Sequence, residues 1–139
     1  MSVLGRRSVL AAGAGLLATP QAVAESNGGP WAIELFTSQG CSSCPPADRQ
    51  LGKLARRPDI VALSFHVDYW DYIGWKDRFA SKATTERQRA YARTLRQKYV
   101  YTPEMVVDGR VHQPGIQDSQ VESMLADARR PFWRRWIGN

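Results

Sequence analysis

The chemistry that this sequence offers is concentrated in two residues, Cys41 and Cys44, which are its whole cysteine content. Two thiols separated by two residues can exchange with other disulfides, or they can supply half of a tetrahedral metal site. A structural cross-link usually closes a longer loop, because the entropy removed from the unfolded chain grows with loop length. The spacing therefore favours thiol–disulfide exchange over a structural disulfide.

A helix is predicted to begin at the cysteine pair. Pro45 and Pro46 follow at once, and consecutive prolines are tolerated only in a first turn, where backbone donors have no intrahelical partner. The free N–H groups and partial positive charge of a helix N-terminus stabilise a thiolate. We expect Cys41, the more exposed thiol, to be the nucleophile and Cys44 to resolve the mixed disulfide.

Metal binding is the main alternative for the cysteine pair. Zinc would need two further ligands, and the only histidines, His66 and His112, lack the usual clustered spacing. A soft metal such as Cu(I) held by Cys41, Cys44 and His66 stays open, although copper-delivery proteins that use two cysteines and a histidine typically space the cysteines one residue further apart. A third alternative is a redox-inert interaction module. No resident cofactor is expected.

The elements that must position the cysteines follow from periodicity and turn residues. A strand, helix and second strand in succession form a unit that is normally right-handed and parallel. Thr85 and Gln88 are spaced like a capping box for a later helix. The predicted elements are a strand over 31–36, a helix ending at Pro58, a strand over 60–67, a loop over 68–79, a helix over 81–99, a hairpin of strands over 104–107 and 110–112, and a helix over 118–130.

The loop over residues 68–79, the aromatic loop, contains the residues that compete for a role near the thiols. Its aspartates are expected to cap turns and bind backbone N–H groups. Its aromatic side chains are expected to pack, but Trp70 or Trp75 could line a substrate groove. His66, directly before the loop, is either a structural residue, a base or the metal ligand named above.

The order of elements, with C-x-x-C at the start of the first helix and a proline before the third strand, resembles the thioredoxin fold. We expect an α/β fold with a central mixed sheet of about four strands flanked by helices. Three segments make the resemblance more specific. They are ELFTSQGCSSCPPAD at 34–48, HVDYWDYIGWKD at 66–77 and YTPEMVVDG at 101–109.

These segments are similar to those of the domain of unknown function 1223 (DUF1223) family, over about residues 31–125. The resemblance implies a secreted bacterial protein with a thioredoxin-like core and no established substrate. It also places Thr102–Pro103 opposite the cysteines. There we expect a cis bond, Pro103 as part of the catalytic site with Cys41 and Cys44, and Thr102 and Trp70 as substrate contacts.

The N-terminus has the three parts of a secretory signal, in order, over residues 1–24. Arg6 and Arg7 resemble a twin-arginine export signal, and the apolar stretch is shorter than the roughly 20 residues that span a bilayer. We expect a thioredoxin-like domain over 25–130 that is periplasmic or secreted. Residues 131–139 form a tail that does not match the family pattern and is interpreted as a truncated family C-terminus.

Charge and motifs exclude several classes of function. Removing residues 1–24 takes away two arginines and lowers the net charge from +6 to +4, and no nucleic-acid fold motif accompanies the basic segments. No Ser-His-Asp arrangement is evident around the serines that neighbour the cysteines, so serine hydrolysis is not expected. The expected partners are thiols or disulfides of exported proteins, with no nucleic acid and no stable membrane span after signal removal.

Overall fold

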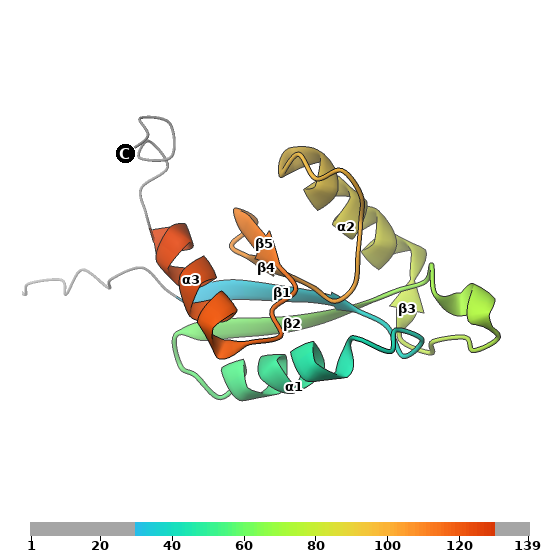
Figure 1. Ribbon diagram of the computed structural model, residues 1–139, viewed down its shortest axis with the longest axis horizontal. Helices are drawn as coiled ribbons and strands as arrows, with labels where there is room; N and C mark the ends of the chain where they lie inside the picture. Colours follow the sequence, from blue (N-terminus) through green and yellow to red (C-terminus); the bar gives the residue numbers. More distant parts are fainter. Residues whose placement is uncertain (1–29, 130–139) are drawn as a thin grey trace, which may run out of the picture.

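The computed structural model describes residues 30–129, so the predicted signal and the tail over 131–139 lie outside the described residues. The described chain is an α/β domain in which a mixed sheet is flanked by helices (Figure 1). The elements are β1 (Trp31–Thr37), α1 (Pro45–Leu54), β2 (Ile60–Val67), the 3-10 helix η1 (Asp71–Ile73), β3 (Ala80–Ser81), α2 (Lys82–Thr94), β4 (Glu104–Val107), β5 (Val111–Gln113) and α3 (Asp118–Arg129).

The sheet has the strand order β3-β2-β1-β4-β5, and β1 lies at its centre. β1 runs parallel to β2 and antiparallel to β4, which confirms the mixed sheet and the parallel strand-helix-strand unit. The sheet holds five strands instead of the expected four. The additional strand, β3, is only two residues long and pairs with His66 and Val67, and such a short strand leaves no alternation in a sequence.

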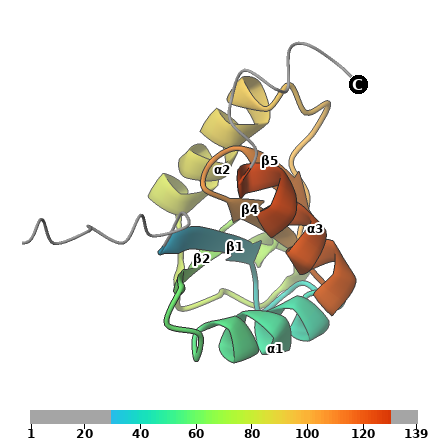
Figure 2. The ribbon, with the colours of Figure 1, turned by 90° about the vertical axis from the view of Figure 1, so that its left-hand side faces the viewer.

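Helices cover both faces of the sheet. α1 and α2 lie on opposite sides of it (Figure 1), and a quarter turn shows α3 beside the β4–β5 hairpin (Figure 2). One core cluster joins the sheet to α1 and α3, and a second lies on the side of α2. The central strand is therefore buried on both faces. Its buried apolar residues are Trp31, Ile33, Leu35 and Phe36.

The helix ends show which local signals are decisive. α1 begins at Pro45 with Cys44 as its N-cap residue, so the predicted start at the cysteine pair is confirmed. α2 begins at Lys82, next to the predicted start at residue 81, but the predicted capping box is wrong, because the N-cap Ser81 accepts a hydrogen bond from the Thr84 N–H. Thr85 and Gln88 are instead buried in the helix. α2 also ends at Thr94, five residues before the predicted end.

Candidate functional site

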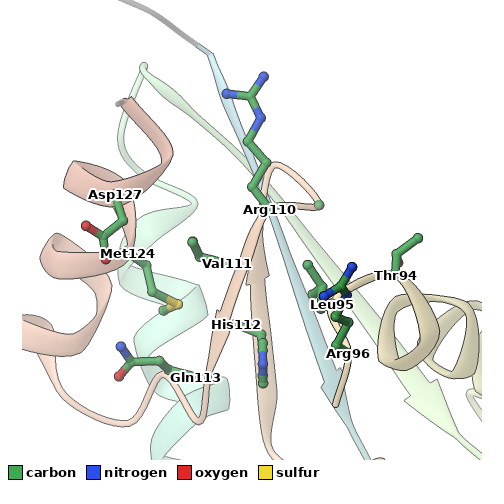
Figure 3. A pocket seen from close by; sticks show the side chains of 10 residues that line it. Thr94, Leu95, Arg96, Arg110, Val111, His112, Gln113, Met124 and Asp127 are labelled. Atoms are coloured by element: carbon green, nitrogen blue, oxygen red, sulfur yellow. The ribbon is translucent and has the colours of Figure 1, made fainter. Parts of the chain in front are cut away.

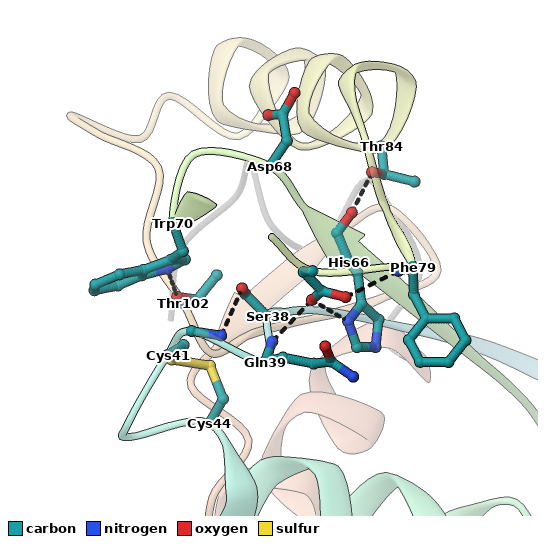
Figure 4. Close-up of polar contacts among 12 residues, drawn as sticks. Ser38, Gln39, Cys41, Cys44, His66, Asp68, Trp70, Phe79, Thr84 and Thr102 are labelled. Carbon is teal, nitrogen blue, oxygen red and sulfur yellow. Dashed lines mark hydrogen bonds and ion pairs between the residues drawn. A yellow bond between two sulfur atoms is a disulfide. The ribbon is translucent and has the colours of Figure 1, made fainter. Parts of the chain in front are cut away.

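Cys41 and Cys44 form a disulfide at the turn between β1 and α1 (Figure 4). Their Cα atoms are 5.4 Å apart, and the Cys44 N–H donates to the Cys41 carbonyl at 3.2 Å. The Cys44 carbonyl then accepts from the Asp48 N–H inside the first turn of α1. The sulfur pair is thus built into the N-terminal end of α1, where the helix dipole places a partial positive charge.

The two sulfurs differ in how far solvent reaches them. Cys44 is fully buried, and Cys41 retains 3% exposure. This is the order predicted for a nucleophile and a resolving thiol, but Cys41 is less open than expected. The Cys41 Sγ lies 3.5 Å from the Ser43 hydroxyl, which is on the exposed side of the turn. Of the two residues, Cys41 is therefore the one that an incoming thiol meets first.

Thr102 and Trp70 lie beside the disulfide (Figure 4). The Thr102–Pro103 bond is cis, as predicted. The Trp70 Nε1–H donates to the Thr102 hydroxyl at 2.7 Å, and both residues lie near Cys41 in Figure 4. Trp70 also touches the residue before Cys41, because a Cβ built on Gly40 would lie 3.1 Å from the Trp70 Cβ. The structure thus brings the predicted substrate-contact residues to the cysteines, and their role in binding stays a prediction.

His66 is directed away from the sulfurs. Its Nδ1 lies 2.6 Å from the Asp77 Oδ2, and its ring packs edge-on against Phe79 at 5.4 Å between centroids (Figure 4). Among residues 30–129 no group of three His, Cys, Asp or Glu side chains is placed to hold a metal ion. The alternative metal set of Cys41, Cys44 and His66 is therefore not assembled in the described structure.

Asp77 organises the segment that leads to the cysteines. Its buried carboxylate accepts hydrogen bonds from the N–H groups of Gln39 at 2.8 Å and Phe79 at 2.9 Å, in addition to the His66 contact. Burial alone would raise the pKa of Asp77, but these hydrogen bonds outweigh burial and lower the pKa below its ordinary value. The predicted binding of backbone N–H groups by the loop aspartates is confirmed here. Its link to the cysteine segment was not visible in the sequence.

Replacing Asp77 by asparagine should loosen this segment. One acceptor oxygen becomes an NH₂ group that faces donors, so the Gln39 or Phe79 N–H loses its partner. We expect Asp77→Asn to lower the free energy of unfolding by about 1–2 kcal/mol, within the usual cost of an unsatisfied buried donor. Denaturant unfolding measures this effect. Asp48→Asn is the matched control, because Asp48 is exposed, and equal losses in both variants would contradict the assignment.

A buried polar network lies behind Pro103. The Glu104 carboxylate is completely buried and accepts from the Gln88 side-chain amide at 2.7 Å and from Gln97. Gln88 in turn accepts from the Tyr69 hydroxyl at 3.1 Å, and burial raises the pKa of Tyr69 to about 12. Burial also raises the pKa of Glu104 above its ordinary 4.5, against the lowering effect of the two amides. Sequence reasoning missed Glu104, whose only visible feature is its place at the start of a short predicted strand.

The raised pKa of Glu104 predicts a pH dependence of stability. The folded protein holds this proton more tightly than the unfolded chain does. The stabilisation is complete below pH 4.5 and is lost as the pH rises through the higher folded pKa. We expect Glu104→Gln to flatten the fall in unfolding free energy over the interval above pH 4.5, as measured by urea unfolding at successive pH values. An unchanged slope in the variant would show that other groups cause it.

The described surface also has an open groove of about 750 Å³ away from the cysteines. The end of α2, the β4–β5 hairpin and α3 line it, and Figure 3 shows Arg96 and Arg110 on its rim with Met124 and Asp127 across from them. None of its lining residues is a predicted site residue. The groove is therefore separate from the predicted site.

The fold and the cysteine pair at a helix N-terminus define a thioredoxin-like protein. The chain belongs to the DUF1223 family, described as "protein of unknown function", whose match covers residues 32–135. This match confirms the family predicted from the three sequence segments.

A solved structure supports the same conclusion. The chain resembles the crystal structure of a structural genomics target from Agrobacterium tumefaciens, with 48% sequence identity and a TM-score of 0.67. The match covers 72% of this chain and 46% of that one, so the chain spans about half the length of the solved protein. No curated protein matches the chain.

Proposed function

We propose that this protein is an exported thiol–disulfide oxidoreductase in which Cys41 and Cys44 cycle between dithiol and disulfide. The observation that carries the proposal is a disulfide between residues three apart, placed at the N-terminal end of α1. Such a short loop contributes little as a cross-link. Its position instead suits exchange, because the helix end stabilises the thiolate that every exchange step releases or uses.

The reaction proceeds through a mixed disulfide on Cys41. When the protein acts as oxidant, a substrate thiolate attacks the Cys41 Sγ, the Cys41–Cys44 bond breaks, and Cys44 leaves as a thiolate. A second substrate thiolate then attacks the substrate sulfur of the mixed disulfide and displaces Cys41. The substrate loses two electrons and becomes a disulfide, and the protein gains them as two thiols. The reverse sequence reduces a substrate disulfide and leaves Cys41 and Cys44 oxidised.

A redox titration of the purified exported protein tests the proposal. In buffers of varied glutathione redox ratio, we expect a single two-electron transition between dithiol and disulfide, followed by thiol labelling and mass. The Cys41→Ser/Cys44→Ser double variant is the control and should show no transition. A protein isolated with stoichiometric copper whose thiols resist titration would favour the soft-metal alternative. The absence of both copper and titration would leave the redox-inert module.

Export is part of the same proposal and has its own test. A basic n-region, an apolar segment and a small-residue cleavage site occur in signal order before Glu25. We expect the mature protein to begin near Glu25 and to be recovered outside the cytoplasm, as measured by intact mass of the fractionated protein. Replacing Arg6 and Arg7 by lysine should stop export if the route is twin-arginine. An intact Met1 on the mature protein would contradict cleavage.

Within residues 30–129 no helix is long and apolar enough to cross a membrane.

A further inference from the structure

Exposed apolar side chains are concentrated in the aromatic loop. Among residues 30–129, eight large apolar side chains are exposed, and four of them lie between residues 72 and 79. Tyr72 is 80% exposed and Phe79 is 69% exposed, and Ile73 and Trp75 complete the group. Scattered apolar residues on a surface are ordinary, whereas a local concentration marks an interaction site. We call these four residues the apolar patch.

The apolar patch is fastened to the segment that leads to Cys41. The Trp75 Nε1–H donates to the Gln39 side-chain carbonyl at 3.0 Å. Ile73 packs against Gly40 so closely that a Cβ there would lie 3.0 Å from the Ile73 Cδ1. Figure 1 shows η1, which contains Tyr72 and Ile73, projecting at the end of the molecule where β1 gives way to the cysteine turn. A molecule bound on the patch would therefore be held next to the disulfide.

The exposed charged side chains next to the patch in the sequence are positive. Lys76, Arg78 and Lys82 are exposed, and none of them has an ion-pair partner among the described residues. The acidic residues of the loop are less exposed than these cations, since Asp68 and Asp71 are half-buried. Asp77 is buried, and Asp71 accepts a hydrogen bond from the Asp77 N–H at 3.1 Å. The patch therefore combines apolar contact area with a positive rim.

We propose that the apolar patch and its basic rim bind an extended, cysteine-containing segment of an exported polypeptide whose cysteine is flanked by apolar and acidic residues. This rests on the proposed function, since only exchange on Cys41 requires a thiol in that segment. Apolar side chains would cover Tyr72 and Phe79, and carboxylates would face Lys76 and Arg78. The patch contacts Gln39 and Gly40, the two residues before Cys41, so a molecule bound on the patch lies next to the disulfide. This placement favours a thiol-bearing peptide over a bilayer surface.

Thiol-free peptides test the docking surface apart from redox chemistry. One peptide carries a central serine between leucine, phenylalanine and glutamate residues, and the other carries the same serine between glycine and lysine residues. We expect the first to bind the intact exported protein at least tenfold more tightly, as measured by calorimetry. Tyr72→Ala/Phe79→Ala should weaken its binding about tenfold, whereas Val61→Ala, an exposed apolar residue at the opposite end of β2, should not.

The charge of the rim has a separate test. Lys76→Glu/Arg78→Glu changes two exposed side chains, so folding is not at risk even if the aromatic variants are unstable. It should reduce the affinity for the acidic peptide about tenfold and remove most of its salt dependence. Equal affinity for the two peptides in the unaltered protein would overturn the proposal. Binding to anionic lipid vesicles that depends on the patch, with no peptide binding, would overturn it in favour of a membrane surface.

Cysteine versions of the same peptides separate this inference from the proposed function. If the serine peptide binds and the cysteine peptide forms no mixed disulfide, the docking surface is supported and the oxidoreductase is not. If cysteine peptides exchange at equal rates whatever their flanking residues, the oxidoreductase is supported and the docking surface is overturned. Faster exchange with apolar and acidic flanks, lost in Tyr72→Ala/Phe79→Ala, supports both.

Discussion

Replacing Cys44 by serine should leave the protein covalently attached to its substrates through Cys41. Attack on a substrate disulfide requires only the Cys41 thiolate, whereas release of the mixed disulfide requires Cys44. Cys41 is also the residue of the pair that keeps some exposure, 3% against 0% for Cys44. We expect Cys44→Ser to accumulate mixed disulfides that the unaltered protein does not retain. Non-reducing gels of the exported fraction, with and without a reductant, measure them.

The reciprocal variant is the matched control. Cys41→Ser leaves a single thiol that is fully buried as the N-cap residue of α1, so it should trap nothing. Cys41→Ser/Cys44→Ser should behave in the same way. Trapping by Cys41→Ser but not by Cys44→Ser would reverse the assigned roles, and trapping by neither would remove the support for exchange.

The position of the cysteines could be predicted because the signals that fix it are local. Pro45 and Pro46 exclude every helical position except the first turn, and the structure starts α1 there. The family segments then located Thr102–Pro103, and the structure places Thr102 near Cys41 and makes the bond cis. Proline geometry and a motif of nine residues need no knowledge of the rest of the chain, so this part of the site could be read without coordinates.

The supports of the site could not be predicted, because they join residues that are distant in sequence. Asp77 binds the Gln39 N–H across 38 positions, and Glu34 meets Arg87 across 53. An aspartate in an aromatic loop predicts a bond to some backbone donor, but only the tertiary structure decides which donor. The buried Glu104 is a similar case. A carboxylate in a short strand is expected to face solvent. Its burial becomes understandable only once Gln88 on α2 is seen to donate to it.

The capping residue of α2 was also not predicted, although the start of the helix was. Thr85 and Gln88 fit the spacing of a capping box, yet Ser81 caps the helix and both residues point into the core. The pattern recurs wherever threonine and glutamine are three apart, and it is decisive only when the preceding residues cannot be helical. Here β3 ends at Ser81, and pairing of that short strand with β2 sets the start of the helix.

Among the polar contacts, the ion pair of Glu34 and Arg87 should be the most costly to break. Glu34 projects from the central strand and keeps 6% side-chain exposure, and both of its oxygens accept from the Arg87 guanidinium, at 2.6 and 2.8 Å. The Tyr91 hydroxyl donates to the same carboxylate at 2.7 Å. Removing the cation would leave a carboxylate buried against the sheet with one neutral donor, and such an uncompensated charge is strongly destabilising.

We therefore expect Arg87→Ala to lower the free energy of unfolding by roughly 2–3 kcal/mol. This is less than the ~3–5 kcal/mol of a fully buried pair, because Arg87 keeps 47% exposure and water can partly replace it. Arg89→Ala is the matched control, since its pair with Glu86 is half exposed on both sides, and it should cost at most about 0.5 kcal/mol. Denaturant unfolding of both variants decides the matter. Equal losses would mean that Glu34 is solvated when Arg87 is absent, and that helix α2 is held to the sheet by its apolar contacts alone.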